Sequence, residues 1–79
     1  MTQKLPPAVR KALLLDNAVK LATKSGVFNL TFEKVGETCD PPCSERTVRS
    51  YYPRKIDLFR AVIESDPIAF AEDALKLEN

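Results

Sequence analysis

The 79-residue chain contains no histidine, two cysteines and two glycines, and these shortages exclude several kinds of functional site. A closed zinc site needs four ligands, which Cys39 and Cys43 alone do not supply. With only Gly26 and Gly36 there is no glycine-rich phosphate loop, and no serine lies beside a plausible base. We therefore expect no enzyme activity, no metal and no cofactor.

The chain also lacks the long hydrophobic runs of membrane and secreted proteins. No apolar run approaches the ~20 residues that span a bilayer, and the first residues lack the continuous apolar segment of a secretory signal. We therefore expect no membrane partner and a cytoplasmic location. The net charge is only +1, but residues 1–30 are mostly basic and residues 61–79 mostly acidic. This asymmetry allows one oriented docking face.

What the chain does contain is helical periodicity. Apolar residues make up 44% of it and recur at helical spacing, with no alternating strand pattern. Gly26 is placed to end one helix, and Thr31 and Ser44 are placed to begin others. An Asp66-Pro67 pair is placed to begin the last. We expect an all-α fold, a small bundle of four to five helices forming a single domain. The predicted helices span residues 8–25, 32–39, 44–51, 54–65 and 67–77.

The most informative segment lies between residues 30 and 58. Two short apolar-periodic helices are separated there by the break Asp40-Pro41-Pro42. Gly36 inside the first of them predicts close approach by a neighbouring helix. A short helix, a tight turn and a second helix with arginines on its outer face is the arrangement that presents side chains to a DNA major groove.

Four segments, in this order and at these separations, carry a resemblance to a known family. They are LLDNAVKLATKSG (residues 14–26), LTFEKVGE (30–37), SERTV (44–48) and YYPRKIDL (51–58). The chain resembles, over roughly residues 8 to 64, the N-terminal DNA-binding domain of the tetracycline-repressor (TetR) family of bacterial regulators. The resemblance implies a helix-turn-helix with the recognition helix at residues 44–51.

The resemblance also implies roles for individual residues. Thr31 would offer its helix N-terminus to a phosphate, and Thr47 would contact the backbone or a thymine methyl group. Tyr51 and Lys55 would fix the docking register, with Lys55 on a phosphate.

The chain departs from the family in three respects. The turn DPPC is one residue longer than the usual Ala-Gly-Val-Ser type, and Arg49 stands where the family usually has a tyrosine. Beyond residue 66 the sequence does not contain the family's C-terminal domain, which binds ligand and forms the dimer. No small-molecule ligand is therefore expected.

The predicted recognition helix carries polar side chains suited to reading bases. Glu45 could accept from cytosine, Arg46 and Arg49 could bind guanine or clamp a phosphate, and Ser50 could add a small polar contact. The alternative is a solvated face on which Glu45 and Arg49, four residues apart, form a weak ion pair. The helix-turn-helix context favours DNA contact. The predicted DNA-binding residues are Thr31, Ser44, Glu45, Arg46, Thr47, Arg49, Ser50, Tyr51, Arg54 and Lys55.

Neighbouring residues extend this hypothesis. Lys4, Arg10 and Lys11 either add phosphate contacts or only solubilise the chain. Of the two adjacent tyrosines, we expect Tyr52 in the core and Tyr51 near DNA.

The two cysteines and the last helix each leave alternatives open. Cys39 and Cys43 could share zinc between chains or form a local disulfide, but buried free thiols are favoured. In the last helix, one apolar stripe can cover the core. A second stripe beside it would either remain available for a partner or help the helix to close the bundle. A single short recognition helix binds weakly, so we expect self-association as a two-fold dimer or a head-to-tail array. The residues expected to mediate it are Ile68, Phe70, Leu75 and Leu77.

These observations predict a sequence-specific double-stranded DNA-binding transcriptional regulator, a small repressor of bacterial, plasmid or phage type. Two other functions stay open. One is an architectural DNA-binding protein that forms arrays on DNA in recombination or partition. The other is a protein-interaction module such as an anti-repressor.

Overall fold

The computed structural model describes residues 5–78, and all regular structure within them is helical. The prediction of an all-α fold is therefore confirmed. The elements are α1 (Pro7–Ser25), a short 3-10 helix η1 (Val27–Asn29), α2 (Phe32–Thr38), α3 (Glu45–Tyr51), α4 (Lys55–Ser65) and α5 (Ala71–Glu78).

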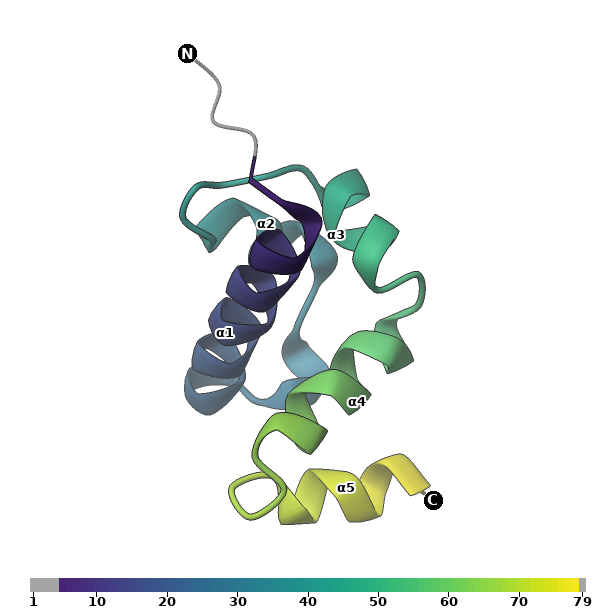
Figure 1. Ribbon diagram of the computed structural model, residues 1–79. Helices are drawn as coiled ribbons and strands as arrows, with labels where there is room; N and C mark the ends of the chain where they lie inside the picture. The colour runs from purple at the N-terminus through teal and green to yellow at the C-terminus, as the bar shows by residue number, and fades with distance from the viewer. Residues whose placement is uncertain (1–4, 79) are drawn as a thin grey trace.

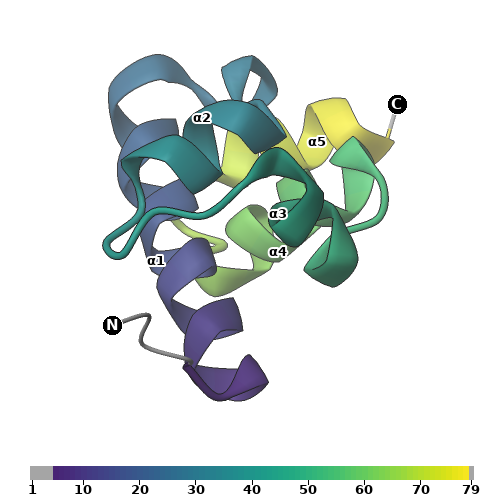
Figure 2. The ribbon, with the colours of Figure 1, turned by 90° about the horizontal axis from the view of Figure 1, so that it is seen from above.

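The helices form a small bundle with two distinct ends (Figure 1). α1 packs against both α2 and α4, α2 packs against α3, and α5 packs against α4. The start of α1 and the connection between α2 and α3 lie at one end, and α5 lies at the other (Figure 1). Figure 2, viewed from the first end, shows α2 and α3 side by side, with α1 along the left of the view.

Local capping sets the ends of the helices that were predicted from sequence. Gly26, with φ 96°, donates its backbone N–H to the Ala22 carbonyl oxygen at 2.8 Å and ends α1. The hydroxyl of Thr31 accepts from the Lys34 amide at 3.1 Å. The hydroxyl of Ser44 accepts from the Thr47 amide at 3.2 Å. Each hydroxyl cap stabilises its helix by about 1 kcal/mol.

The start of the last helix differs from the prediction. Asp66 does cap the segment, since its carboxylate accepts from the Ala69 amide at 3.2 Å. Residues 67–70 nevertheless form a turn, and the regular helix begins only at Ala71. The turn directs Phe70 inward, where its side chain is only 6% exposed. The predicted helix start at residue 67 is therefore wrong, because the prediction did not consider that the Phe70 ring is buried in the core.

The hydrophobic core lies where α1, α2, α3 and α4 meet. Its largest fully buried side chains are Leu14, Val27, Val35, Val48, Leu58 and Val62. Among the described residues no buried side-chain nitrogen or oxygen lacks a hydrogen-bond partner. All buried residues of the described range are apolar or, like Tyr52 and Cys39, largely apolar, so packing of apolar side chains builds the interior.

Candidate nucleic-acid interface

Gly36 allows α3 to pack directly on the backbone of α2. The Cys43 amide donates a hydrogen bond of 3.0 Å to the Gly36 carbonyl oxygen. A Cβ atom at position 36 would lie 3.0 Å from Val48 Cγ2 and 3.3 Å from the Ser44 carbonyl oxygen. The close approach predicted from the sequence is confirmed, and it fixes the start of α3 against α2.

Two side chains of α1 bind α2 and the connection that follows it. The Arg10 guanidinium donates to the Pro41 carbonyl oxygen and lies 3.9 Å from Cys39 Sγ. Farther along α1, the Asn17 amide nitrogen donates to the Val35 carbonyl oxygen at 2.9 Å and to Thr38 Oγ1 at 2.8 Å. Arg10 of α1 therefore holds the proline-rich turn in place, and Asn17 holds the end of α2.

Arg10 is a residue whose role sequence reasoning missed. It was expected to contact phosphate or to solubilise the chain, but its guanidinium is bound to the turn. Residues 41 and 42 are prolines and have no backbone N–H to donate. The two prolines were the sequence feature that indicated a hydrogen-bond donor from another part of the chain. Lys4, another of the three basic residues considered with Arg10, lies outside the described residues.

The polar residues at the start of α3 bond to one another. Ser44 Oγ and Thr47 Oγ1 are 3.1 Å apart, and the Ser50 hydroxyl donates to the Thr47 carbonyl oxygen at 2.6 Å. Ser44 and Ser50 are exposed, and Thr47 is half-buried. Arg46 is exposed as well, and within residues 5–78 it makes no hydrogen bond or ion pair. Arg46 is therefore the free guanidinium of the predicted recognition helix.

Arg49, by contrast, is held by two contacts. Its Nη2 lies 3.0 Å from Glu45 Oε1, which is the ion pair given above as the alternative to DNA contact. Its guanidinium carbon lies 5.3 Å from the centre of the Phe32 ring at the start of α2. The side chains of Arg49 and Glu45 are 59% and 47% exposed, so this pair contributes only about 0–1 kcal/mol. Arg49 is oriented but still reachable from solvent.

Of the two tyrosines, Tyr52 lies in the core as expected, and Tyr51 is partly buried against the same core. Tyr52 is only 5% exposed. Lys11 Nζ lies 5.6 Å from the centre of the Tyr52 ring, so the start of α1 also contacts the end of α3. Burial raises the pKa of the Tyr52 hydroxyl. Lys11 therefore lies beside the end of α3 and adds a positive charge at the edge of the predicted DNA-binding surface.

At the start of α4 the two predicted phosphate anchors differ. Arg54 Nε lies 3.2 Å from Asp57 Oδ2, and the Arg54 backbone amide donates to the same oxygen at 3.1 Å. The hydrogen bond from the Arg54 side chain lowers the pKa of Asp57, and the backbone bond adds to this effect. Lys55 is exposed and makes no ion pair among the described residues. Lys55 is thus the unpaired cation of the two, whereas Arg54 is bound to Asp57, whose carboxylate accepts a hydrogen bond from the backbone amide at the start of α4.

Both cysteines are free thiols, Cys39 buried and Cys43 half-buried. Burial raises the pKa of Cys43, the charge of Arg10 opposes the rise, and Cys39 adds to it. Within residues 5–78 no group of three or more potential ligands could hold a metal ion. No helix in the same range combines the length and hydrophobicity needed to cross a bilayer.

The charges of the molecule divide between its two ends. The start of α1, α3 and the start of α4 carry the cations Arg10, Lys11, Arg46, Arg49, Arg54 and Lys55, which outnumber the anions Asp40, Glu45 and Asp57 of the same region. Two of these anions are paired with Arg49 and Arg54. The end of α4, the following turn and α5 carry Glu64, Asp66, Glu72 and Asp73. A polyanion would therefore be attracted to the end that presents α3.

Comparisons with known protein families, with curated proteins and with solved structures find no match for this chain.

Proposed function

We propose that the protein is a sequence-specific double-stranded DNA-binding regulator that inserts α3 into the major groove. The observation that carries the proposal is the exposed, unpaired Arg46 on a short helix fixed rigidly against α2. A free guanidinium on the outer face of such a helix is suited to bind the O6 and N7 atoms of a guanine. The resemblance to the TetR family, which rests on sequence segments, adds to this argument.

The other polar residues support the same docking. Thr31 and Lys55 belong to the starts of α2 and α4, which flank α3, and their backbone amides and charge suit phosphate oxygens. In the proposed complex Arg49 either stays on Glu45 and Phe32 or releases Glu45 to reach a base. Because the pair is exposed, releasing it costs about 1 kcal/mol or less. Glu45 in turn would disfavour sequences that place no hydrogen-bond donor beside it.

Occupying a specific site would exclude polymerase or another regulator, which is the action of a small repressor. A single helix reads only a few base pairs, so two copies on two half-sites are expected. The half-sites would then be about 10 base pairs apart, or a multiple of that distance, and related by two-fold symmetry.

Selection of bound duplexes from a random pool, with the mass of the complex measured, tests the proposal. We expect an enriched motif with two inverted half-sites and two chains bound. A direct repeat whose footprint grows with protein concentration would instead favour an architectural protein that forms arrays. Absence of any preferred duplex at moderate salt would contradict the proposal.

One observation favours a second candidate, a protein-interaction module such as an anti-repressor. Ile68 and Leu75 near the C-terminal end of the chain are 91% and 65% exposed, which is unusual for large apolar side chains. An Arg46→Ala variant separates the two functions. If its DNA affinity falls while its activity in the cell is unchanged, the interaction module is the correct function.

A further inference from the structure

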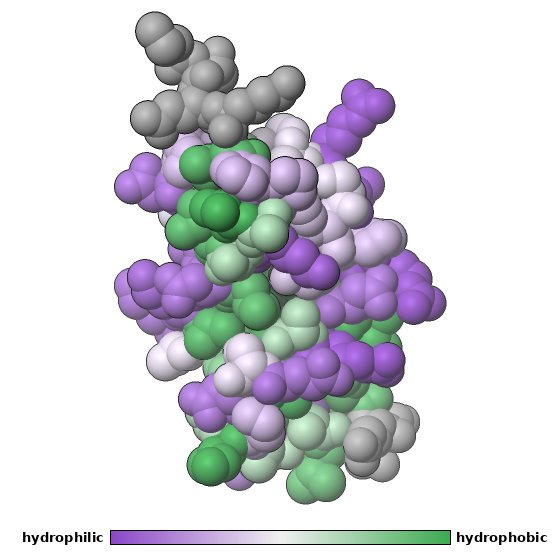
Figure 3. All heavy atoms as spheres, in the orientation of Figure 1, coloured by the Kyte–Doolittle hydropathy of each residue, from purple (hydrophilic) through white to green (hydrophobic). Residues whose placement is uncertain are grey.

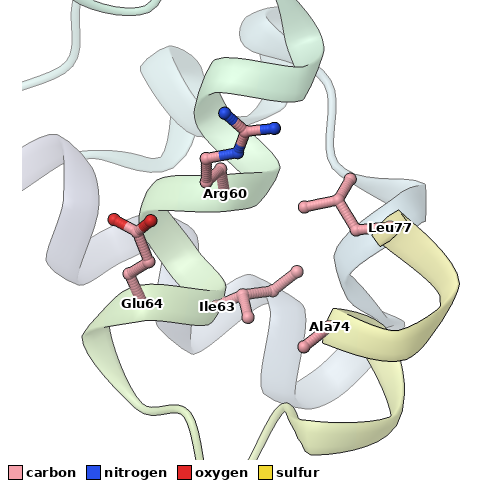
Figure 4. A pocket seen from close by; sticks show the side chains of 5 residues that line it. All are labelled: Arg60, Ile63, Glu64, Ala74 and Leu77. Carbon is pink, nitrogen blue, oxygen red and sulfur yellow. The ribbon is translucent and has the colours of Figure 1, made fainter. Parts of the chain in front are cut away.

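The helix α5 has two apolar faces, and only one of them is covered. On the inner face, Phe70 is buried, and Ala74 and Leu77 are partly buried against the core. Figure 4 shows Leu77 of α5 and Ile63 of α4 pointing toward each other across a hollow of about 380 Å³. Of the residues expected to mediate self-association, Phe70 and Leu77 thus belong to the inner face.

The outer apolar surface at this end, the outer face of α5, is formed by Ala71 and Leu75, four residues apart on the helix, and by Ile68 of the turn that precedes it. Ile68 is 91% exposed, Leu75 is 65% exposed, and Ala71 between them is exposed as well. Figure 3 shows hydrophobic atoms at the surface over residues 67–70 and α5, at the lower end of the view. A small residue between two large ones allows a second helix to approach closely there.

The charges beside this face indicate which helix fits it. Glu72 and Lys76 lie four residues apart along one flank, and neither forms an ion pair within residues 5–78. If two copies of α5 lie antiparallel, Glu72 of each copy faces the partner's Lys76, so two ion pairs form at once. In a parallel two-fold pair this flank would instead face the opposite flank of the partner, so Glu72 and Lys76 would not meet each other. The flank with Glu72 and Lys76 is therefore complementary to the same flank of a second copy only when the two helices are antiparallel.

We propose that the outer face of α5 is where two copies of this chain associate, antiparallel about a two-fold axis. Leu75 packs over the partner's Ala71, and Ile68 closes each end of the contact. Because α5 lies at the end of the bundle away from α3, both α3 helices stay free (Figure 1). The proposed function supplies only the role of this dimer, which is to pair two recognition helices. The contact itself is inferred from the residues of α5 and the turn before it.

The area available sets the strength of the association. α5 spans eight residues, so the contact is smaller than that of a permanent dimer. We expect a dissociation constant in the range of about 10 µM to 1 mM without DNA. Two half-sites on one duplex would raise the effective concentration of the two chains and strengthen the pair.

Sedimentation equilibrium of the full chain without DNA, at protein concentrations from about 10 µM to 1 mM, tests the contact. The wild type should pass from monomer to dimer, and Leu75→Glu should weaken association at least about tenfold. Val9→Glu is the matched control, because Val9 is an apolar residue 45% exposed on α1, away from α5. It should leave association unchanged. A wild type that stays monomeric throughout, or a Leu75→Glu variant that dimerises normally, would overturn the inference.

Charge reversal tests the antiparallel direction. Glu72→Lys and Lys76→Glu should each weaken self-association, because each places like charges opposite one another. An equimolar mixture of the two variants, and the double variant alone, should both recover the dimer. Mixing that gives no recovery would refute the antiparallel pair. Monomers that still select a DNA motif would refute this inference alone, whereas dimers without DNA preference would refute only the proposed function.

Discussion

A Cβ atom on Gly36 would lie 2.5 Å from the backbone carbonyl oxygen of Cys43, closer than atoms can approach without a shift. Cys43 belongs to the connection that leads into α3, so the position of α3 depends on position 36 having no side chain. The neighbour is backbone rather than a flexible side chain, so it cannot move aside locally. The hydrogen bond from the Cys43 amide to the Gly36 carbonyl oxygen would be disturbed by the same shift.

We therefore expect Gly36→Ala to lower the free energy of unfolding by about 1–3 kcal/mol, the usual cost of overpacking. The folded variant should also bind DNA more weakly, because α3 is displaced. Chemical denaturation and a DNA titration measure the two effects. Gly26→Ala is the control. Gly26 has a positive φ, so the variant should be destabilised by about 1 kcal/mol or more, but its folded form should keep its DNA affinity.

Arg10 should act through the α2–α3 connection rather than through DNA. Arg10→Met keeps much of the apolar stem and leaves the Pro41 carbonyl oxygen without its charged donor, so stability should fall by about 1–3 kcal/mol. Thermal unfolding checks this. Lys20→Met on the same helix removes only an exposed ion pair with Asp16 and should change stability by less than about 1 kcal/mol. Equal effects of the two substitutions would mean that Arg10 does not support the turn.

The helix ends were predictable because they depend on a few neighbouring residues. Gly26, Thr31 and Ser44 act within three or four residues of themselves, and so a single sequence contains the whole interaction. Gly36 was also informative, since a glycine inside a helix needs a tertiary reason. Val27 and Phe28 look from the sequence like buried loop residues, which is right for Val27 and wrong for Phe28. Phe28 is 42% exposed and packs edge-on against Phe59, with the ring centres 5.3 Å apart, a contact between distant residues.

The partners of the charged residues were only partly predictable. The Glu45–Arg49 pair follows from helical spacing and was given as an alternative, but the additional stacking of Arg49 on Phe32 needs the packing of α3 against α2. The contact of Arg10 with Pro41 joins residues 31 positions apart, and nothing in the local sequence specifies it. The candidate surface is therefore visible from the sequence, while the division between free and bound cations is not.

Arg46 should be the main base-reading residue of α3. Arg46→Ala should cost about 1–3 kcal/mol of DNA-binding free energy and relax the preference at one position of the motif. Arg49→Ala should have a smaller or mixed effect, because it also removes the contacts with Glu45 and Phe32. Titrations with the selected duplex and its single-base variants measure both. If Arg46→Ala weakened all duplexes equally, Arg46 would be a phosphate contact instead.

Lys55 should act as a phosphate anchor. Because it is unpaired at the start of α4, Lys55→Ala should weaken binding to all duplexes by a similar factor. The slope of log affinity against log salt should fall by about one. Arg54→Ala is the comparison, and it should lower the stability of α4 through loss of the contacts with Asp57. A change in base preference on replacing Lys55 would contradict its assignment to the backbone.

The thiol of Cys43 provides a test of the α2–α3 connection that needs no DNA. Since burial raises its pKa, less thiolate is present near neutral pH than in a free cysteine, and alkylation should be slow and should accelerate only at higher pH. A raised pKa in the folded state also means that this group's contribution to stability is lost as the pH rises through that pKa.

Arg10→Met removes the positive charge that opposes the rise in the Cys43 pKa, so the pH at which alkylation accelerates should be higher in this variant. Iodoacetamide rates across pH, with Cys39→Ser to isolate the signal, measure this. A profile matching that of the unfolded chain would show that the connection is not held against α1.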